Sequence, residues 1–177
     1  MPQQVKINLD FYKGADLYSD GEVESEILSI VQQYHDYSKI LAETTSWPIY
    51  YHLSPLRRNL LEWYFFRQDA SLLEIGAGCG ALTGLFCDKV ASVTAVELSK
   101  KRAEILATRY YNRSNLNIIV GNFYDISFER KFDYVTLIGV LEYCGKYIDT
   151  HNPHIDFLKR VKSLLTPNGT LIIAIEN

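Results

Sequence analysis

Apolar and polar residues alternate with two different periods in the first third of the chain. Residues 5–11 alternate singly, a pattern that predicts a half-buried strand. From Glu22 the apolar positions recur at helical spacing and acidic residues crowd the first turn, which predicts an amphipathic helix of about four or five turns. A second helix is predicted from Ser54 to about Asp69, because Ser54 and Pro55 supply an N-cap and a first-turn proline.

From Ser71 onward, short apolar runs alternate with amphipathic segments. Strands are predicted at about 71–75, 92–97, 117–121, 133–138 and 170–175, and helices at about 81–89, 99–111 and 153–165, with residues 166–169 as the exit turn of the last helix. This alternation predicts an α/β fold with a doubly wound, mostly parallel, Rossmann-like sheet and helices on both faces. Residues 1–53 are then an N-terminal strand and helix extension, and residues 54–177 form the core domain.

Composition narrows the function classes. The 177 residues are 47% hydrophobic and 22% charged, which fits one main globular domain. The net charge of −3, without a long run of Lys and Arg, disfavours nucleic acid as a partner. No apolar stretch approaches the roughly 18 residues of a membrane helix, so we expect a cytoplasmic protein with no membrane contact. The three cysteines and four histidines match no metal-binding spacing, so we expect no metal site.

Three alternating glycines stand between a predicted strand and a predicted helix, in the segment Glu74-Ile-Gly-Ala-Gly-Cys-Gly80. Without side chains, Gly76, Gly78 and Gly80 allow the backbone to turn tightly and to approach a ligand closely. The N–H groups at the start of the following helix are available to polar ligand groups. This segment is the candidate cofactor-binding loop.

A second acid, Glu97, ends the next predicted strand, about twenty residues beyond Gly76. A carboxylate at this position accepts hydrogen bonds from both hydroxyls of a ribose. The alternative is that Glu97 only favours the N-terminus of the helix that begins near Ser99. In the first interpretation, two strand ends converge on one nucleoside.

Two cofactor classes fit the glycine loop. Gly76–Ala81 also satisfies the G-x-G-x-x-A pattern of dinucleotide-binding proteins, which makes an NAD(P)-dependent oxidoreductase the alternative. Glu74 distinguishes the two, because an ionised carboxylate there would repel a pyrophosphate and attract the cationic amino-acid end of S-adenosylmethionine. Charge complementarity therefore favours the sulfonium cofactor.

Together these residues resemble the class I S-adenosylmethionine-dependent methyltransferase family, whose first motif is an acid followed by G-x-G-x-G. The resemblance implies that the glycine loop holds the methionine moiety and that Glu97 binds the ribose. Where the family often carries G-D-A, this chain has Asn122 after Gly121 and Asp125 further on, so either side chain is a candidate for the adenine contact. The cofactor-binding residues that the resemblance implies are Glu74, Gly76, Ala77, Gly78, Gly80, Glu97, Leu98, Asn122, Phe123, Gly139 and Leu141.

The segment Tyr50–Trp63 is similar to a subgroup of bacterial methyltransferases associated with glycosyltransferases and polysaccharide synthesis. This similarity implies O-methyl transfer to a sugar or small-molecule acceptor, with a glycosyltransferase or a second copy of the chain as candidate partner. A non-catalytic cofactor-binding domain of a larger polysaccharide-synthesis protein is a further alternative. His52, Glu142 and Tyr143 are candidates for a general base by location alone, so the sequence designates no catalytic residue.

The C-terminal part of the sequence departs from the family pattern. Members of the family normally continue beyond the fifth core strand with a helix and an antiparallel strand pair. Here the predicted strand at 170–175 is followed only by Glu176 and Asn177. We therefore expect the C-terminal strand pair to be missing and the chain to be part of a longer protein, with an exposed sheet edge that invites pairing.

Overall fold

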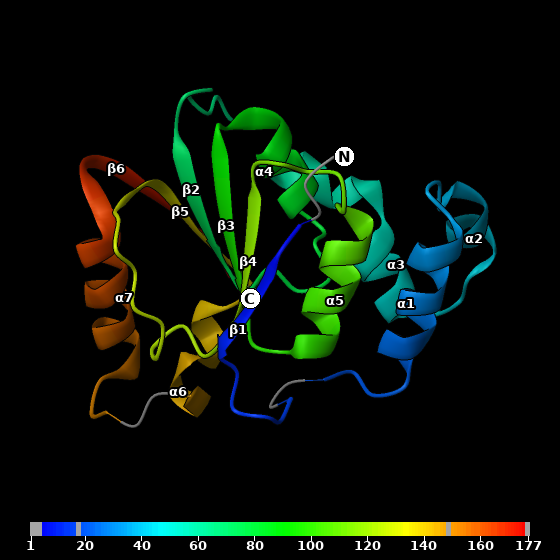
Figure 1. Cartoon of the computed structure of the whole chain (residues 1–177), viewed down its shortest axis with the longest axis horizontal. Coiled ribbons are helices and arrows are strands. Elements are labelled where there is room, and N and C mark those ends of the chain that lie inside the picture. The colour runs from blue at the N-terminus through cyan, green and yellow to red at the C-terminus, as the bar shows by residue number, and fades with distance from the viewer. Residues whose placement is uncertain (1–4, 17–18, 148–149, 176–177) are drawn as a thin grey trace.

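The computed structural model describes residues 5–16, 19–147 and 150–175, in which six strands form one parallel sheet (Figure 1). The strands are β1 (Ile7–Phe11), β2 (Ser71–Ile75), β3 (Ser92–Glu97), β4 (Leu116–Gly121), β5 (Phe132–Ile138) and β6 (Leu165–Ala174). The helices are α1 (Val23–Gln33), α2 (Ser38–Glu43), α3 (Trp47–Leu53), α4 (Thr83–Lys89), α5 (Lys100–Arg109), α6 (Cys144–Tyr147) and α7 (Pro153–Leu164), with 3-10 helices η1 (Pro55–Leu60) and η2 (Leu141–Tyr143).

From β2 onward, the path of the chain through the strand order β1-β4-β3-β2-β5-β6 reverses once. The chain proceeds from β2 outward to β3 and β4, then crosses to the other side of β2 to form β5 and β6. Loops that leave β2 and β5 therefore diverge to opposite faces, and the crevice between them at the carboxyl ends of the strands is where such sheets bind ligands.

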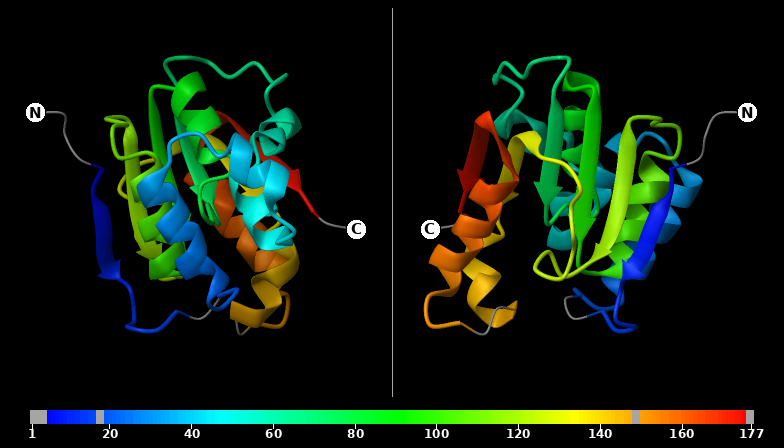
Figure 2. Two further views of the ribbon diagram at one scale, coloured as in Figure 1. Left: turned by 90° about the vertical axis from the view of Figure 1, so that its right-hand side faces the viewer. Right: turned by 60° about the vertical axis from the view of Figure 1, so that its left-hand side comes forward.

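Helices cover both faces of the sheet. Helices α1, α3 and α5 lie on one side and α7 lies on the other (Figure 2). Successive residues of β2 supply the two cores: Leu72 packs in a cluster with Leu106 of α5, whereas Leu73 packs in a cluster with Phe157 and Val161 of α7. This arrangement confirms the predicted doubly wound, mostly parallel sheet.

The N-terminal extension contributes directly to the sheet. Strand β1 pairs in parallel with β4, with Ile7 opposite Ile118, and so forms the edge of the sheet on that side. Helix α1 then packs on α5, where Ile27 and Val31 share a buried cluster with Ile105. The predicted strand and first helix are both present, although the 11 residues of α1 make about three turns rather than four or five.

The prediction of a second helix from Ser54 to about Asp69 is wrong beyond its first turns. Ser54 does act as a cap, since its Oγ accepts a hydrogen bond from the Leu56 N–H at 3.3 Å, but only the 3-10 helix η1 follows. The chain then leaves the helical path because Phe66 packs edge-on against Tyr134 of β5, at 5.1 Å between ring centroids. The short helices α2 and α3 were not predicted, because six or seven residues contain too few turns to establish a period.

The last strand begins earlier than predicted. Leu165 already pairs with Phe132, and pairing resumes with Thr170 opposite Tyr134. Residues 166–169, which the sequence predicts as an exit turn, lie between these two paired stretches as an interruption of β6. The predicted chain end at Glu176 and Asn177 lies outside the described residues.

Candidate functional site

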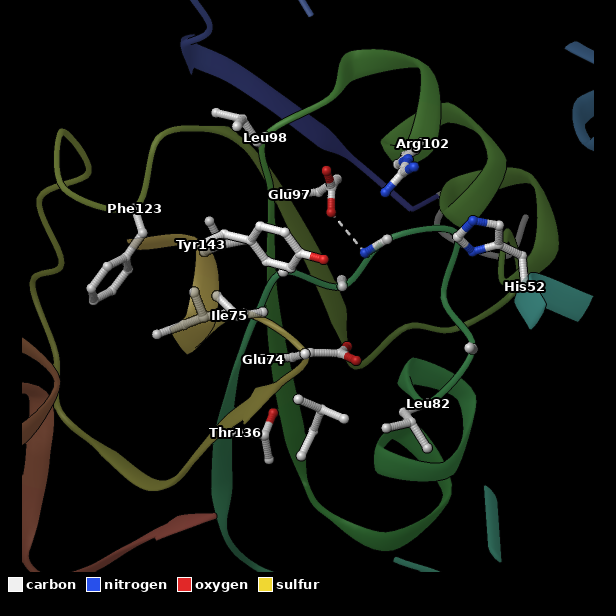
Figure 3. A pocket seen from close by; sticks show the side chains of 18 of the residues that line it. His52, Glu74, Ile75, Leu82, Glu97, Leu98, Arg102, Phe123, Thr136 and Tyr143 are labelled. Atoms are coloured by element: carbon white, nitrogen blue, oxygen red, sulfur yellow. Dashed lines mark hydrogen bonds between the residues drawn. The ribbon is translucent and has the colours of Figure 1, made fainter. Parts of the chain in front are cut away.

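A cavity of about 370 Å³ lies at the carboxyl ends of the central strands, at the reversal of strand order. Its walls come from the segments that follow β2, β3, β4 and β5, and from α3 and η1 (Figure 3). Its volume falls within the roughly 300–1,000 Å³ of small-molecule sites. The fold therefore brings the separately predicted motifs to one place.

The glycine loop lines the floor of this cavity. Gly76, Gly78 and Gly80 all have positive φ angles, of 75°, 56° and 81°, which non-glycine residues rarely adopt. A Cβ at Gly76 would collide with the Val140 side chain, whereas at Gly78 the nearest atom is Cε1 of His52, at 4.0 Å. The missing side chain of Gly78 thus leaves open space in the cavity, as close approach of a ligand to the backbone requires.

Glu97 joins the end of β3 to this loop. Its Oε2 accepts a hydrogen bond from the Gly78 N–H at 2.7 Å, and its Oε1 accepts one from the Ser99 N–H at 2.9 Å (Figure 3). The side chain is buried, and burial raises the pKa of its carboxyl. A carboxylate has about four acceptor positions, so the main-chain bonds to Glu97 leave capacity for a ribose hydroxyl.

Glu74 also lies in the cavity, but its protonation differs from the expected state. The side chain is buried at the centre of the site, and its Oε2 accepts a hydrogen bond from the Thr83 hydroxyl at 2.6 Å. Burial raises the pKa of Glu74 to about 8, so the carboxyl of the free protein is mostly protonated at pH 7. An ionised Glu74, on which the sequence argument against a pyrophosphate depended, therefore requires a cation beside it.

The segment after β4 separates the two candidates for the adenine contact. Asn122 lines the cavity, and its Oδ1 accepts a hydrogen bond from the Tyr124 N–H at 3.0 Å. Asp125 is instead paired with Lys13 at 2.7 Å and does not line the cavity. Phe123 lies on the cavity wall (Figure 3), where an aromatic ring suits a purine.

Most of the implied cofactor residues are brought together. Those that line the cavity are Glu74, Gly76, Ala77, Gly78, Glu97, Leu98, Asn122, Phe123 and Gly139. Gly80 and Leu141 do not line it. The Gly80 carbonyl accepts a hydrogen bond from the Tyr110 hydroxyl at 2.8 Å, which fixes the exit of the loop against α5. Of the candidates for a general base, His52 and Tyr143 line the cavity and Glu142 does not.

A buried ionic network holds the N-terminal wall of the site. Arg102 of α5 pairs with Asp20 and Glu24, each at 2.6 Å, and the Oδ2 of Asp20 that contacts Arg102 also lies 3.3 Å from Nε2 of His52. Burial lowers the pKa of His52, which favours a neutral imidazole. No spacing in the sequence announces this network, because its members come from three segments that meet only in the fold.

The N-terminal segment contributes further lining residues, two of which belong to the segment Tyr50–Trp63 that carries the subgroup resemblance. Trp47 and Tyr51 of α3 and Arg57 of η1 all line the cavity. Arg109 of α5 donates to the His52 carbonyl at 2.9 Å and to the Cys79 carbonyl at 2.6 Å, which ties α3 to the glycine loop. Trp47 lies just before the segment Tyr50–Trp63, and no motif in the sequence indicated it.

The described part of the chain contains neither a metal-binding group of side chains nor a membrane-spanning helix. Over residues 5–16, 19–147 and 150–175, no group of three His, Cys, Asp or Glu side chains is placed to hold a metal ion. Within the same ranges, every helix is too short or too polar to cross a bilayer.

Residues 73–173, more than half of the chain, match the protein family described as "Methyltransferase domain". Malonyl-[acyl-carrier protein] O-methyltransferase of Priestia megaterium is 31% identical over 118 residues, which are 66% of this chain and 40% of that protein. Ribosomal RNA small subunit methyltransferase A of Hahella chejuensis is 38% identical over 71 residues, 40% of this chain and 24% of that protein. The chain thus spans less than half the length of these curated relatives.

Two solved structures show the same fold. Phosphoethanolamine N-methyltransferase 1 of Haemonchus contortus, in complex with phosphoethanolamine and S-adenosylhomocysteine, superposes with a TM-score of 0.63 at 15% identity, covering 87% of this chain and 32% of that one. The DhpI–SAH complex superposes with a TM-score of 0.57 at 20% identity, covering 88% and 70%. At these identities the likeness establishes the fold alone.

Proposed function

The chain belongs to the methyltransferase domain family, as a class I S-adenosylmethionine-dependent member, and from this premise we propose that it binds S-adenosylmethionine in the cavity above β2 and β3. We further propose that the protein transfers the methyl group to an oxygen of a sugar or small-molecule acceptor. The NAD(P)-dependent alternative loses its support, because the family match covers the glycine loop itself.

The observation that carries the cofactor proposal is the contact between Glu97 and the glycine loop. The Gly78 N–H donates to the Glu97 carboxylate at 2.7 Å, so the two motifs form one surface. On this surface Glu97 accepts the ribose hydroxyls, while Gly78 lets the ligand approach the backbone. Asn122 and Phe123 lie where the adenine would follow, on the next strand end along the sheet.

The residues fit the cofactor at its cationic end as well. Glu74 is a buried carboxyl whose raised pKa falls when a positive charge arrives, so binding of the ammonium or sulfonium group and ionisation of Glu74 support each other. The bound cofactor supplies a methyl group already activated for displacement. The chain's own contribution is then to position donor and acceptor and to exclude water, which is where orientation has its largest effect on rate.

We assign no catalytic base. His52 is a structural member of the ionic network, held by Asp20 at 3.3 Å and by its carbonyl contact with Arg109, and we propose that it positions α3 over the glycine loop. Tyr143 lines the cavity beside the glycine loop (Figure 3) and is a candidate acceptor contact. The lack of an assigned base agrees with a reaction whose rate depends mainly on the orientation of donor and acceptor.

The acceptor proposal rests on the similarity of Tyr50–Trp63 to glycosyltransferase-associated methyltransferases. Helix α3 and η1 from this segment line the cavity, so it is placed to contact an acceptor. The curated relatives include an O-methyltransferase of malonyl-[acyl-carrier protein] and rRNA methyltransferases. Association with a glycosyltransferase, self-association and a cytoplasmic location remain predictions.

The test is isothermal titration of the chain with S-adenosylhomocysteine and, separately, with NAD. We expect saturable binding of S-adenosylhomocysteine, no binding of NAD, and at least tenfold weaker S-adenosylhomocysteine binding by Glu97→Ala, since charged hydrogen bonds contribute about 1.5–3 kcal/mol. Glu129→Ala, which alters an exposed acid outside the cavity, is the matched control. NAD binding, or equal affinity in the Glu97 variant, would refute the proposal.

A further inference from the structure

Among the described residues, one basic side chain of the cavity lacks a carboxylate partner. Three basic side chains line the cavity, and of these Arg102 is paired with Asp20 and Glu24, while burial lowers the pKa of His52 and favours its neutral form. Arg57 has no carboxylate partner among the residues that the structure describes. An arginine is always charged at physiological pH, so this guanidinium is a fixed positive charge at the site.

The guanidinium of Arg57 is held in place by an aromatic residue. Its Cζ lies 4.2 Å from the centroid of the Tyr51 ring, and its Nη2 donates to the Tyr51 hydroxyl at 3.1 Å. The Tyr51 ring in turn packs edge-on against His52, with 5.2 Å between ring centroids. Side chains fixed in this way lose little further entropy when a ligand binds, so the positive charge is preorganised.

The surroundings of Arg57 favour an anion. Its Nε is buried and has no hydrogen-bond partner among the residues that the structure describes, so the guanidinium has lost hydration without gaining an acceptor there. The Tyr51 hydroxyl lies 4.0 Å from the position that a Cβ would occupy at Gly139, which places the pair over the end of β5. This is the side of β2 opposite to Glu97, where the ribose is proposed to bind.

The charge of the proposed cofactor leads to the same conclusion. The sulfonium and ammonium groups of S-adenosylmethionine are both positive, so an uncompensated guanidinium in the same cavity would oppose binding. A carboxylate between them removes the repulsion and matches the planar fork of arginine in two parallel hydrogen bonds. The charges of the cofactor therefore favour an anionic group near Arg57 in the complex, in addition to the carboxyl groups of Glu74 and Glu97.

Resting on the proposed function, we propose that Arg57 and Tyr51 form a binding site for a carboxylate next to the reacting methyl group. The carboxylate has two sources, the amino-acid end of the cofactor or an anionic acceptor. Arg57 is then a binding residue of the site, and Tyr51 is a positioning residue that orients it. The neighbouring Arg58, paired with Glu62 at 3.1 Å and Asp88 at 2.9 Å, has no such role.

The experiment compares S-adenosylmethionine with decarboxylated S-adenosylmethionine, which retains both positive charges and lacks only the carboxylate. Affinities are measured by titration calorimetry for the wild-type chain, for Arg57→Met and for the control Arg58→Met. A cofactor source predicts a wild-type preference of about 10- to 100-fold for the carboxylated form, lost in Arg57→Met and kept in Arg58→Met. Tyr51→Phe should reduce the preference by a smaller factor, of about two- to tenfold.

An acceptor source gives a different pattern. Arg57→Met then keeps the preference between the two cofactors, but the S-adenosylhomocysteine complex of the wild type and of Arg58→Met binds malonate as a dicarboxylate probe, and that of Arg57→Met does not. If Arg57→Met changes neither measurement while its thermal unfolding matches that of Arg58→Met, Arg57 only covers Tyr51 and the inference is overturned. A wild-type chain that binds neither cofactor overturns the proposed function, and the inference with it.

Discussion

The packing of the glycine loop against the segment after β5 can be tested by adding a single methyl group. Gly76 has a φ of 75°, and a Cβ there would collide with Cγ2 of Val140. Gly76→Ala therefore encounters two separate penalties, a left-handed backbone conformation and a steric overlap. Gly14 offers a matched control, because its φ is 85° and a Cβ there would have no atom within 4 Å.

The two penalties have different sizes. The left-handed conformation costs a non-glycine residue about 1–2 kcal/mol, and this cost applies to both Gly76→Ala and Gly14→Ala. Overpacking at a fixed contact adds about 1–3 kcal/mol, and this cost applies only at Gly76. We therefore expect Gly76→Ala to lower the free energy of unfolding by about 2–5 kcal/mol and Gly14→Ala by about 1–2 kcal/mol.

Urea unfolding followed by fluorescence measures both variants, together with Val140→Ala and the double variant Gly76→Ala/Val140→Ala. Removing the Val140 methyl groups should restore part of the stability lost at Gly76, with a coupling energy of about 1–3 kcal/mol between the two sites. Equal losses at Gly76 and Gly14 with additive double-variant values would show that the loop does not pack against Val140 as described.

Three further predictions concern buried polar groups. Thr136→Val should raise the free energy of unfolding by about 1 kcal/mol in urea, because the Thr136 hydroxyl is buried and has no hydrogen-bond partner in the described part of the chain; a loss of stability would contradict this. Burial raises the pKa of Glu74 to about 8, so the folded state favours the protonated carboxyl, and the stability this gives the wild type is lost as pH rises from about 4.5 to about 8. Glu74→Gln does not titrate, so its free energy of unfolding should rise relative to that of the wild type over this range; parallel pH profiles from urea unfolding would refute the raised pKa. Arg102→Met should destabilise the chain by about 3–5 kcal/mol in thermal unfolding by leaving Glu24 buried and unpaired, and Glu24→Leu in the same chain should recover most of the loss.

Local sequence signals predicted the elements of the core. The apolar run Ser71–Ile75 predicted a buried strand, and the glycines after it predicted a sharp turn into a helix. The structure has positive φ angles at these glycines, which glycine adopts readily because it has no Cβ. Likewise Ser99 caps α5 through a hydrogen bond from the Arg102 N–H, at the boundary where the pattern placed the helix. Period and cap together specify such elements without tertiary information.

Tertiary contacts decided what the sequence did not. Residues 54–69 carry good helical signals at their start, but the packing of Phe66 against Tyr134, 68 positions later, overrides them. The protonation of Glu74 was likewise inaccessible, because it depends on how deeply the folded chain buries the carboxyl. The pairing of Arg102 with Asp20 and Glu24 joins segments far apart in the sequence, so no spacing rule could find it.

The parallel pairing of β1 with β4 has a consequence for the order in which the chain folds. Ile7 pairs with Ile118, and because chain synthesis starts at the N-terminus, β1 is made long before its partner strand. Contacts at such separations in sequence form slowly, since the loop between them must close before any pairing is gained. We therefore expect β1 to dock only after β2, β3 and β4 have assembled. The segment that follows β1 contains Asp20, which pairs with Arg102, so we also expect the ionic wall of the cavity to form only when this edge of the sheet does.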